Sequence, residues 1–327
     1  MHKRRLGQDG PMVGAVGLGC MSFGGMYGPT DEATSHTTLK RALDLGVDHL
    51  DTAFIYGEGI SESYIGSFLK RNPAKFTIAT KGGIVIGPPR GVDNSPAYLR
   101  ECIETSLTRL GVEHVELYYI HRRDPAIPIE DVMGTLSRFR EEGKIGAIGF
   151  SEISPASLRR AAAIHPVAAV QSEYSLWTRL PELGLLQACR ELGTAFVAFS
   201  PVGRGMFARD IPDQSRFAKG DFRFRNPRFV DPNYSYNRAY LERFRDFALG
   251  RGWSPAALAI AWTLAQGEHV MPIPGTRTPD HLAELAEGAD IALSAADLAE
   301  IEAILPIGFA AGDRYSDAQY NNVERYC

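Results

Sequence analysis

The chain has 327 residues, of which 44% are hydrophobic, and its formal net charge at pH 7 is -4. This near balance gives no general attraction to nucleic acid or to an anionic membrane, so small molecules are the expected partners. No apolar run is long enough to span a membrane, and the start of the chain lacks the apolar core of a signal peptide. The cysteines show no close pairing or metal-ligand spacing, which favours a reduced, cytoplasmic protein; they are Cys20, Cys102, Cys189 and Cys327.

Strand and helix patterns alternate along the chain. Residues 6–16 form a predicted hairpin around Asp9-Gly10-Pro11, and residues 15–19 form a short buried strand that ends in glycine. Beyond it, segments with helical spacing alternate with short apolar strands, and several helices begin at Ser-Pro or end at Gly. The predicted helices cover residues 31–45, 61–69, 95–111, 129–142, a segment from 154, 181–192, 254–266, 279–287 and 294–304, and the strands cover 47–51, 76–81, 115–121, 145–151, 168–171, 195–200 and 270–273.

The count is about eight strand-and-helix units, interrupted by one long segment. Residues 201–251 are rich in Phe, Tyr, Arg, Pro and Asp, and we expect a long loop there, which is either a lid over a functional site or a disordered insert. No Gly- or Pro-rich linker divides the chain. Because single strands alternate with single helices, we expect an α/β fold: one (β/α)8 TIM barrel over residues 1–327, with an N-terminal β-hairpin and long loops on the carboxyl face.

Residues 49–57 place an acid and a phenol where an apolar strand ends in a loop. Side chains two apart on a strand share a face, so His49 and Asp51 point one way and Leu50 the other. The carboxyl ends of barrel strands, and the loops after them, form the active-site face of such folds. The strand ends are therefore expected to bring together Asp51, Tyr56, Lys81 and His121.

These four residue types suit the reduction of a carbonyl. The carbonyl oxygen needs a proton when hydride adds to the carbon, and a phenol with a pKa of about 10 is a poor donor near neutrality. Lys81 in contact with Tyr56 is expected to lower the pKa of that phenol by about one to three units, while Asp51 keeps Lys81 charged and oriented. His121 would donate a hydrogen bond to the substrate oxygen or relay a proton.

Two other reactions would use some of the same residues. His49 and Asp51 on one strand face, with a carboxylated Lys81, would suit a two-metal hydrolase, but the later strands end in Ser, Gln and Phe rather than in imidazole or carboxylate ligands. No metal is therefore expected. A Schiff-base aldolase would use Lys81 as a neutral nucleophile, whereas Asp51 favours its charged form.

Over essentially its whole length the chain resembles the aldo-keto reductases. The segments that carry the resemblance are Gly17-Leu18-Gly19-Cys20-Met21, Asp51 to Gly57, Lys81-Gly82, Tyr119-Ile120-His121-Arg122, Gly149-Phe150-Ser151, Gln171-Ser172-Glu173-Tyr174, Ser200-Pro201 and Ile273-Pro274-Gly275-Thr276-Arg277. The resemblance implies an NADPH-linked barrel that reduces an aldehyde or ketone to the alcohol. It implies that Tyr56 is the proton donor, assisted by Lys81, Asp51 and His121. An NADPH-binding sensor or regulatory protein with little turnover is the alternative.

The resemblance also implies where cofactor and substrate bind. Ser151 and Gln171 would hold the nicotinamide carboxamide, and Phe199 would stack on the ring where many members have tyrosine. Arg277 would bind the adenosine 2′-phosphate, because a guanidinium matches phosphate oxygens in a two-pronged way, and this favours NADPH over NADH. The implied cofactor-binding residues are Gly19, Met21, Asp51, Ser151, Gln171, Phe199, Ser200, Pro201, Gly203, Arg204, Gly275, Thr276, Arg277, His281 and Glu284. Many members have Arg and then Glu-Asn where this chain has His281 and Glu284-Leu285, so Glu284 keeps only part of that pattern. The implied substrate-binding residues are Tyr27, Tyr56, His121 and Trp177, and the tail residues Tyr315 and Tyr320 are further candidate pocket walls.

Overall fold

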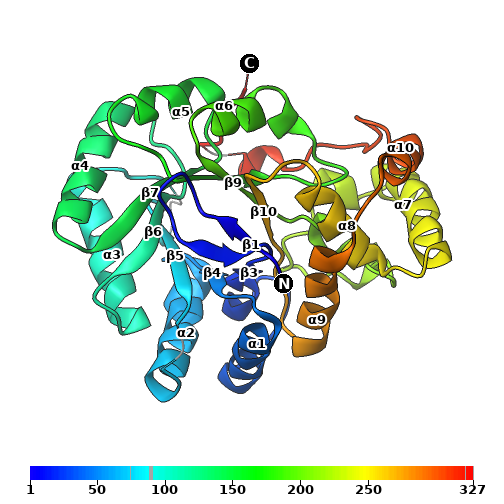
Figure 1. The fold of residues 1–327 in the computed structure, drawn as a ribbon, viewed down its shortest axis with the longest axis horizontal. Helices are drawn as coiled ribbons and strands as arrows, with labels where there is room; N and C mark the ends of the chain where they lie inside the picture. Colours follow the sequence, from blue (N-terminus) through cyan, green and yellow to red (C-terminus); the bar gives the residue numbers. More distant parts are fainter. Residues whose placement is uncertain (74, 88–90, 321, 327) are drawn as a thin grey trace.

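The computed structural model describes residues 1–73, 75–87, 91–320 and 322–326, and Figure 1 shows its strands arranged as a ring with helices around the outside. The strands form one parallel sheet whose order follows the sequence from β3 to β10. The amides of Gly17 and Gly19 donate to the carbonyl oxygens of Pro272 and Pro274 at 3.0 Å, which joins β3 to β10. The expected barrel is confirmed. Its strands are β3 (Leu18–Gly19), β4 (His49–Asp51), β5 (Thr77–Gly82), β6 (Val115–Ile120), β7 (Ile145–Ser151), β8 (Ala169–Glu173), β9 (Ala195–Phe199) and β10 (Val270–Ile273).

The expected N-terminal hairpin is also confirmed. Its antiparallel strands are β1 (Lys3–Arg5) and β2 (Met12–Gly14), so the first strand begins earlier than the sequence pattern suggests. Leu6 and Val13 pack against inward-facing strand residues and close the amino end of the barrel (Figure 1). The guanidinium of Arg4 donates to the carbonyl oxygens of Leu264, Gly267 and Val270 at the same end.

The helices begin and end largely where the sequence signals place them. Asp31 caps the first helix by accepting from the Thr34 amide at 2.7 Å, and Gly46 ends it with a left-handed φ of 74°. Serine side chains cap four later helices in the same way, since each accepts from a backbone amide three residues on. The helices are α1 (Glu32–Leu45), α2 (Ile60–Arg71), α3 (Pro96–Leu110), α4 (Ile129–Glu141), α5 (Pro155–Ala162), α6 (Leu185–Glu191), α7 (Asn233–Gly250), α8 (Pro255–Leu264), α9 (Pro279–Glu287) and α10 (Ala295–Ile304).

The barrel interior combines small residues with two large rings. Alanines on β5, β8 and β9 face inward and leave room for the rings of His49 and Tyr119, both buried. A Cβ atom at Gly17 would lie 2.8 Å from His49 Cδ2, and one at Gly149 would lie 2.5 Å from Tyr119 Cδ1. Glycine is therefore required at both positions by packing. Leu50 faces the helices instead, which confirms the predicted orientation of β4.

The segment 201–251 differs from the long loop that the sequence suggested. It begins with short 3-10 turns, at Gly203–Gly205, Gln214–Arg216 and Pro227–Phe229, and then forms α7, a helix of 18 residues. Pro232 stands at the start of α7, and the Asp231 carboxylate before it accepts from the Ser235 amide at 3.0 Å in the first turn. Tertiary packing also holds the helix, because Leu241 and Phe244 are buried in the outer core.

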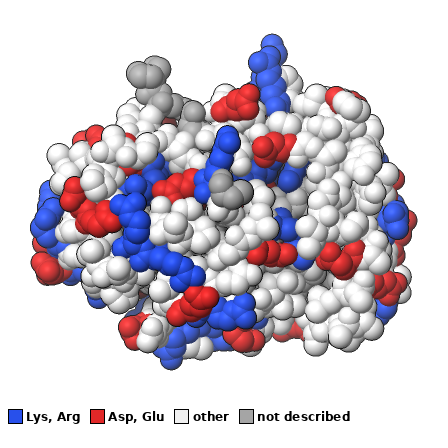
Figure 2. Space-filling view, turned by 90° about the horizontal axis from the view of Figure 1, so that it is seen from above, with Lys and Arg blue, Asp and Glu red and all other residues white. Residues whose placement is uncertain are grey.

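The face of the molecule in Figure 2 carries basic and acidic side chains interspersed with uncharged surface. Its charges do not gather into a field of one sign, in agreement with the small net charge of the chain. Among the described residues, no helix has the length and apolar character needed to cross a membrane. Cys20, Cys102 and Cys189 are buried free thiols, whereas Cys327 lies outside the described residues.

Candidate active site

The structure brings together the four predicted catalytic residues at the carboxyl ends of three neighbouring strands. Asp51 ends β4, Lys81 lies on β5, His121 directly follows β6, and Tyr56 begins the short turn that precedes α2. The Lys81 ammonium donates to Asp51 Oδ1, to the Thr52 carbonyl oxygen at 2.7 Å and to the Tyr56 hydroxyl at 3.5 Å. Lys81 is fully buried, so Asp51 compensates a charge that would otherwise be costly inside the barrel.

The electrostatics of Tyr56 differ from the sequence expectation. Burial raises the pKa of the Tyr56 phenol above its ordinary value of 10.0, and the charge of Asp51 raises it further. The expected decrease through Lys81 is not found, because the ammonium is bonded most closely to Asp51 and Thr52 and because burial dominates. The phenol therefore keeps its proton throughout the neutral range and is available as a donor.

His121 is neutral in this environment. Burial lowers the pKa of His121 well below its ordinary value of 6.5, and the positive charges of Arg122 and Lys81 lower it further. Its ring lies edge-on to that of Tyr56, with the centroids 5.8 Å apart. The Nδ1 atom is buried and has no hydrogen-bond partner among the described residues. A neutral imidazole has one N–H donor, so His121 can offer a hydrogen bond without adding a charge.

Two strand-end residues that were expected to hold a carboxamide also contact the catalytic group. The Gln171 side-chain nitrogen donates to Asp51 Oδ2 at 2.7 Å. The side-chain oxygen of Gln171 takes no part in this hydrogen bond. The Ser151 hydroxyl accepts from Arg122 Nη1 at 3.1 Å. Phe199, at the end of β9, packs on the interior cluster and remains partly exposed. Arg122 was given no role from the sequence, although it directly follows His121 in the motif.

The loop between β10 and α9 presents a group of polar donors beside β3. Gly19 pairs with Gly275 across the strand junction, and Thr276 accepts from the Thr278 amide at 3.2 Å. The Arg277 guanidinium donates through Nη1 to the Pro29 carbonyl oxygen at 3.1 Å. Met21 lies partly exposed in the 3-10 turn Cys20–Gly24, which follows β3. This corner therefore offers a guanidinium together with the backbone amides of a helix start, which is a donor set that suits phosphate.

Two further residues of the proposed cofactor set lie on α9 itself. His281 is exposed in the first turn of the helix, and its amide donates to the capping Thr278 at 3.4 Å. Glu284 accepts a short hydrogen bond from the hydroxyl of Ser254, the residue that caps α8. His281 is thus accessible to a ligand, whereas the Glu284 carboxylate also ties two helices together.

Beyond β9 the backbone adopts left-handed conformations at non-glycine residues. Ser200 has a φ of 52° and Arg204 a φ of 56°, with Pro201 and Gly203 buried between them. The Arg204 guanidinium turns inward and donates to Glu173 at 2.6 Å and to the Arg314 carbonyl oxygen at 2.8 Å. Arg204 belongs to the implied cofactor-binding set, but in the present arrangement its guanidinium is engaged in a buried ion pair.

Trp177 and Tyr27, two of the predicted substrate-binding residues, lie in different surroundings. Trp177 is buried, and its ring contacts those of Phe207 and Phe229 and the Arg228 guanidinium. It therefore anchors the 201–251 segment to the barrel. Burial raises the pKa of Tyr27, whose ring lies 5.5 Å from the Arg223 guanidinium carbon.

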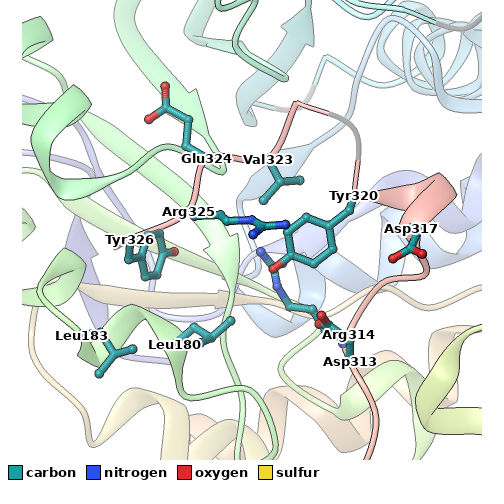
Figure 3. Close-up of a pocket in the computed structure, with 10 residues that line it drawn as sticks. All are labelled: Leu180, Leu183, Asp313, Arg314, Asp317, Tyr320, Val323, Glu324, Arg325 and Tyr326. Carbon is teal, nitrogen blue, oxygen red and sulfur yellow. Dashed lines mark hydrogen bonds between the residues drawn. The ribbon is translucent and has the colours of Figure 1, made fainter.

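The C-terminal tail covers the ends of β7 and β8. Glu324 accepts from the amide and hydroxyl of Ser154 at 2.8 and 2.9 Å, and Arg314 bonds Glu152 next to the end of β7. A cavity of about 660 Å³ lies between the tail and the loop after β8, and in Figure 3 Arg314 and Arg325 point into it beside the Tyr320 ring. Tyr315 is 5% exposed, and its ring lies edge-on to that of the partly exposed Tyr320, with the centroids 5.8 Å apart. Their role as pocket walls stays a prediction.

The sequence model of the aldo/keto reductase family matches residues 15–306. The chain belongs to the aldo/keto reductase family. It is 41% identical to "Probable aldo-keto reductase 1" of Glycine max over 98% of this chain and 93% of that protein. It is 38% identical to the "Aldo-keto reductase yakc" of Schizosaccharomyces pombe, whose name includes NADP(+), over 95% of this chain and 94% of that protein.

Solved structures show the same barrel. The glycerol dehydrogenase AKR11B4 from Gluconobacter oxydans superposes with a TM-score of 0.86 at 30% identity, covering 96% of this chain and 98% of its own. The holo form of the aldo-keto reductase AKR11C1 from Bacillus halodurans superposes with a TM-score of 0.77 at 25% identity, covering 98% and 99%. The protein is thus an oxidoreductase of this family. In the part of the chain that the structure describes, no group of three or more His, Cys, Asp or Glu side chains is arranged to hold a metal ion.

Proposed function

We propose that residues 1–327 act as one catalytic domain that reduces an aldehyde or ketone to the alcohol with NADPH. The observation that carries this proposal is the contact of the buried Lys81–Asp51 pair with the Tyr56 hydroxyl, beside the neutral ring of His121. A phenol that holds its proton, next to a neutral N–H donor, can bind a carbonyl oxygen at two points.

Each catalytic residue has a distinct part in the proposed reaction. Bound NADPH would supply the hydride that adds to the carbonyl carbon. Tyr56 donates its proton to the carbonyl oxygen, and Lys81 stabilises the phenolate that remains. Asp51 keeps the ammonium charged and in place, and His121 orients the carbonyl oxygen by a hydrogen bond.

The donor set at the carboxyl face fits this cofactor. We propose that Ser151 and Gln171 bind the carboxamide and that the exposed part of the Phe199 ring packs on the nicotinamide. At the other end, Arg277 and the start of α9 would bind the 2′-phosphate. Proposed backbone or side-chain contacts between these ends come from Gly19, Met21, Ser200, Pro201, Gly203, Gly275, Thr276, His281 and Glu284; Arg204 would contribute through its backbone because its guanidinium is bound to Glu173.

The test is the variant Tyr56→Phe, assayed by the loss of NADPH absorbance with an aromatic aldehyde and by the fluorescence of bound NADPH. Turnover should fall about a hundred- to ten-thousandfold while NADPH affinity is kept, since only the proton donor is removed. Tyr64→Phe, on α2, is the matched control and should behave as wild type. An unchanged rate in Tyr56→Phe would refute the assignment. NADPH binding without turnover of any carbonyl in the wild type would favour the sensor alternative.

A further inference from the structure

Arg122 places a guanidinium beside the catalytic group, and its hydrogen-bond partners there are neutral. Nη1 donates to the His121 carbonyl oxygen at 2.7 Å and to the Ser151 hydroxyl at 3.1 Å, and Nη2 lies 3.5 Å from the Tyr315 hydroxyl. The side chain therefore spans the ends of β6 and β7 and reaches the tail. Its remaining N–H groups belong to a partly exposed residue.

The carboxylates near this guanidinium are engaged by other side chains. Glu152 pairs with Arg314, and Asp51 is shared by Lys81 and Gln171. Among the ion pairs of the described residues, none within 4.0 Å involves Arg122, whereas Arg123, Arg204, Arg228 and Arg314 are paired. The charge of Arg122 helps to lower the pKa of Glu152, but no described carboxylate is bonded to its guanidinium.

This charge lies close enough to act on the reacting groups. Arg122 follows His121 directly, and the His121 ring lies 5.8 Å from that of Tyr56. The positive charge of Arg122 contributes to lowering the pKa of His121 and of Lys81, and it opposes the rise in the pKa of Tyr56. A ligand held by Tyr56 and His121 would thus bind in the electrostatic field of Arg122.

A guanidinium has a planar set of N–H donors that matches a carboxylate at two points. We propose that Arg122 binds a carboxylate of the substrate, so that the preferred substrates are aldehydes or ketones that also carry an acid group. This inference rests on the proposed function, since it assigns the substrate class to the same site. Ser151, the His121 carbonyl and Tyr315 hold the guanidinium in place, so little conformational freedom is lost when the anion binds.

The test compares an anionic substrate with a neutral one of nearly the same shape, para-formylbenzoate and its methyl ester. We expect the wild type to prefer the acid, and Arg122→Gln to reduce the ratio of the two kcat/KM values, acid over ester, by about ten- to a hundredfold. The loss should appear mainly in KM for the acid. Arg122→Lys should recover part of the ratio, because it restores the charge without the two-pronged geometry.

Arg100→Gln is the control for net charge, because Arg100 is paired with Glu142 on the outer surface. It should leave the ratio unchanged. A ratio that is equally unchanged in Arg122→Gln would overturn the inference while leaving the carbonyl reductase assignment intact. A lower NADPH affinity in Arg122→Gln, with no change in the ratio, would also overturn it and would place the guanidinium at the cofactor.

Binding of the dead-end compound para-hydroxymethylbenzoate tests the anion site without turnover. Calorimetry in the presence of NADPH, with which this alcohol cannot react, should show weaker binding to Arg122→Gln than to wild type. If no carbonyl is reduced but this difference is found, the proposed reaction fails and the anion site stands. Equal binding to both proteins would refute the anion site.

Discussion

The imidazole of His121 lies edge-on to the phenol of Tyr56, with an interplanar angle of 82°. Both rings are neutral near pH 7, because burial lowers the pKa of His121 well below 6.5 and raises the pKa of Tyr56 above 10.0. The pair thus differs from a charged imidazole beside a phenolate. It presents two neutral donors to whatever oxygen lies between them.

This pairing predicts a flat pH profile for carbonyl reduction. Neither ring changes its charge between about pH 6 and 8, so kcat/KM at saturating NADPH should vary by no more than about twofold over that range. As the pH falls, His121 would gain a proton only well below 6.5, and as it rises, Tyr56 would lose its proton only above 10.0. A break near pH 6.5 that disappears in His121→Gln would contradict the neutral assignment.

Arg277→Ala should weaken the binding of NADPH more than the binding of NADH. The guanidinium is anchored to Pro29, and its other N–H groups would bind the 2′-phosphate. Loss of these charged hydrogen bonds should raise the Kd for NADPH by about ten- to a hundredfold and that for NADH by less, as measured by fluorescence titration. His281→Ala should have a smaller effect, because that side chain is exposed. Equal losses for both cofactors would place the phosphate elsewhere.

The barrel and the catalytic strand ends were predictable because their signals are local. Short apolar strands, helix caps and glycines mark each unit, and the register of β4 follows from the alternation of His49, Leu50 and Asp51. Once the strands are parallel neighbours, Lys81 and His121 must lie beside Asp51. The sequence therefore specified which side chains meet, though not their protonation.

The parts that were missed depend on contacts between distant segments. α7 follows an aromatic and arginine-rich stretch without helical spacing, and it is held by burial of residues such as Phe244. Arg204 was implied as a cofactor-binding residue, and the sequence did not indicate that its guanidinium pairs with Glu173, which comes from β8. The pKa of Tyr56 depends on how deeply the loop is covered, and no spacing of residues encodes that depth.

Gly149→Ala should destabilise the barrel through a single added methyl group. The new Cβ would lie 2.5 Å from Tyr119 Cδ1. The Tyr119 ring is fully buried, so it has little room to move away. We expect a loss of about 1–3 kcal/mol in the free energy of unfolding, measured with urea. Lys81 Nζ lies 5.7 Å from the Tyr119 ring centroid, so a shifted ring should lower kcat as well.

Gly134→Ala provides the matched control for that substitution. Gly134 lies within α4, and nothing is within 4 Å of the position that its Cβ would take. Because alanine favours helix over glycine, stability should rise by up to about 1 kcal/mol. The double variant Gly149→Ala with Tyr119→Leu should regain part of the lost stability. If Gly149→Ala is as stable as wild type, the interior packing described above is wrong.

Glu324→Gln should release the C-terminal tail. Glu324 bonds the amide and hydroxyl of Ser154 at the start of α5 and lies 3.3 Å from Arg123 Nε. Burial alone would raise the pKa of Glu324, but the hydrogen bonds from Ser154 and its neighbours outweigh burial and hold it below 4.5. The charged form is therefore favoured by folding. The attachment it provides is complete above the unfolded pKa of about 4.3 and is lost as the pH falls through the lower, folded value.

Hydrogen exchange of the tail amides measures this attachment directly. At pH 6, exchange in residues 322–326 should be faster in Glu324→Gln by about tenfold, since a charged hydrogen bond at a helix start contributes about 1–2 kcal/mol. Protection of the tail amides is the ratio of their intrinsic to their observed exchange rate. In the wild type this protection should fall below about pH 4, whereas in Glu324→Gln it should change little with pH. Glu141→Gln, at an exposed site on α4, is the control. Equal protection of the tail in wild type and Glu324→Gln would show that other contacts, such as Arg314 with Glu152, hold the tail in place.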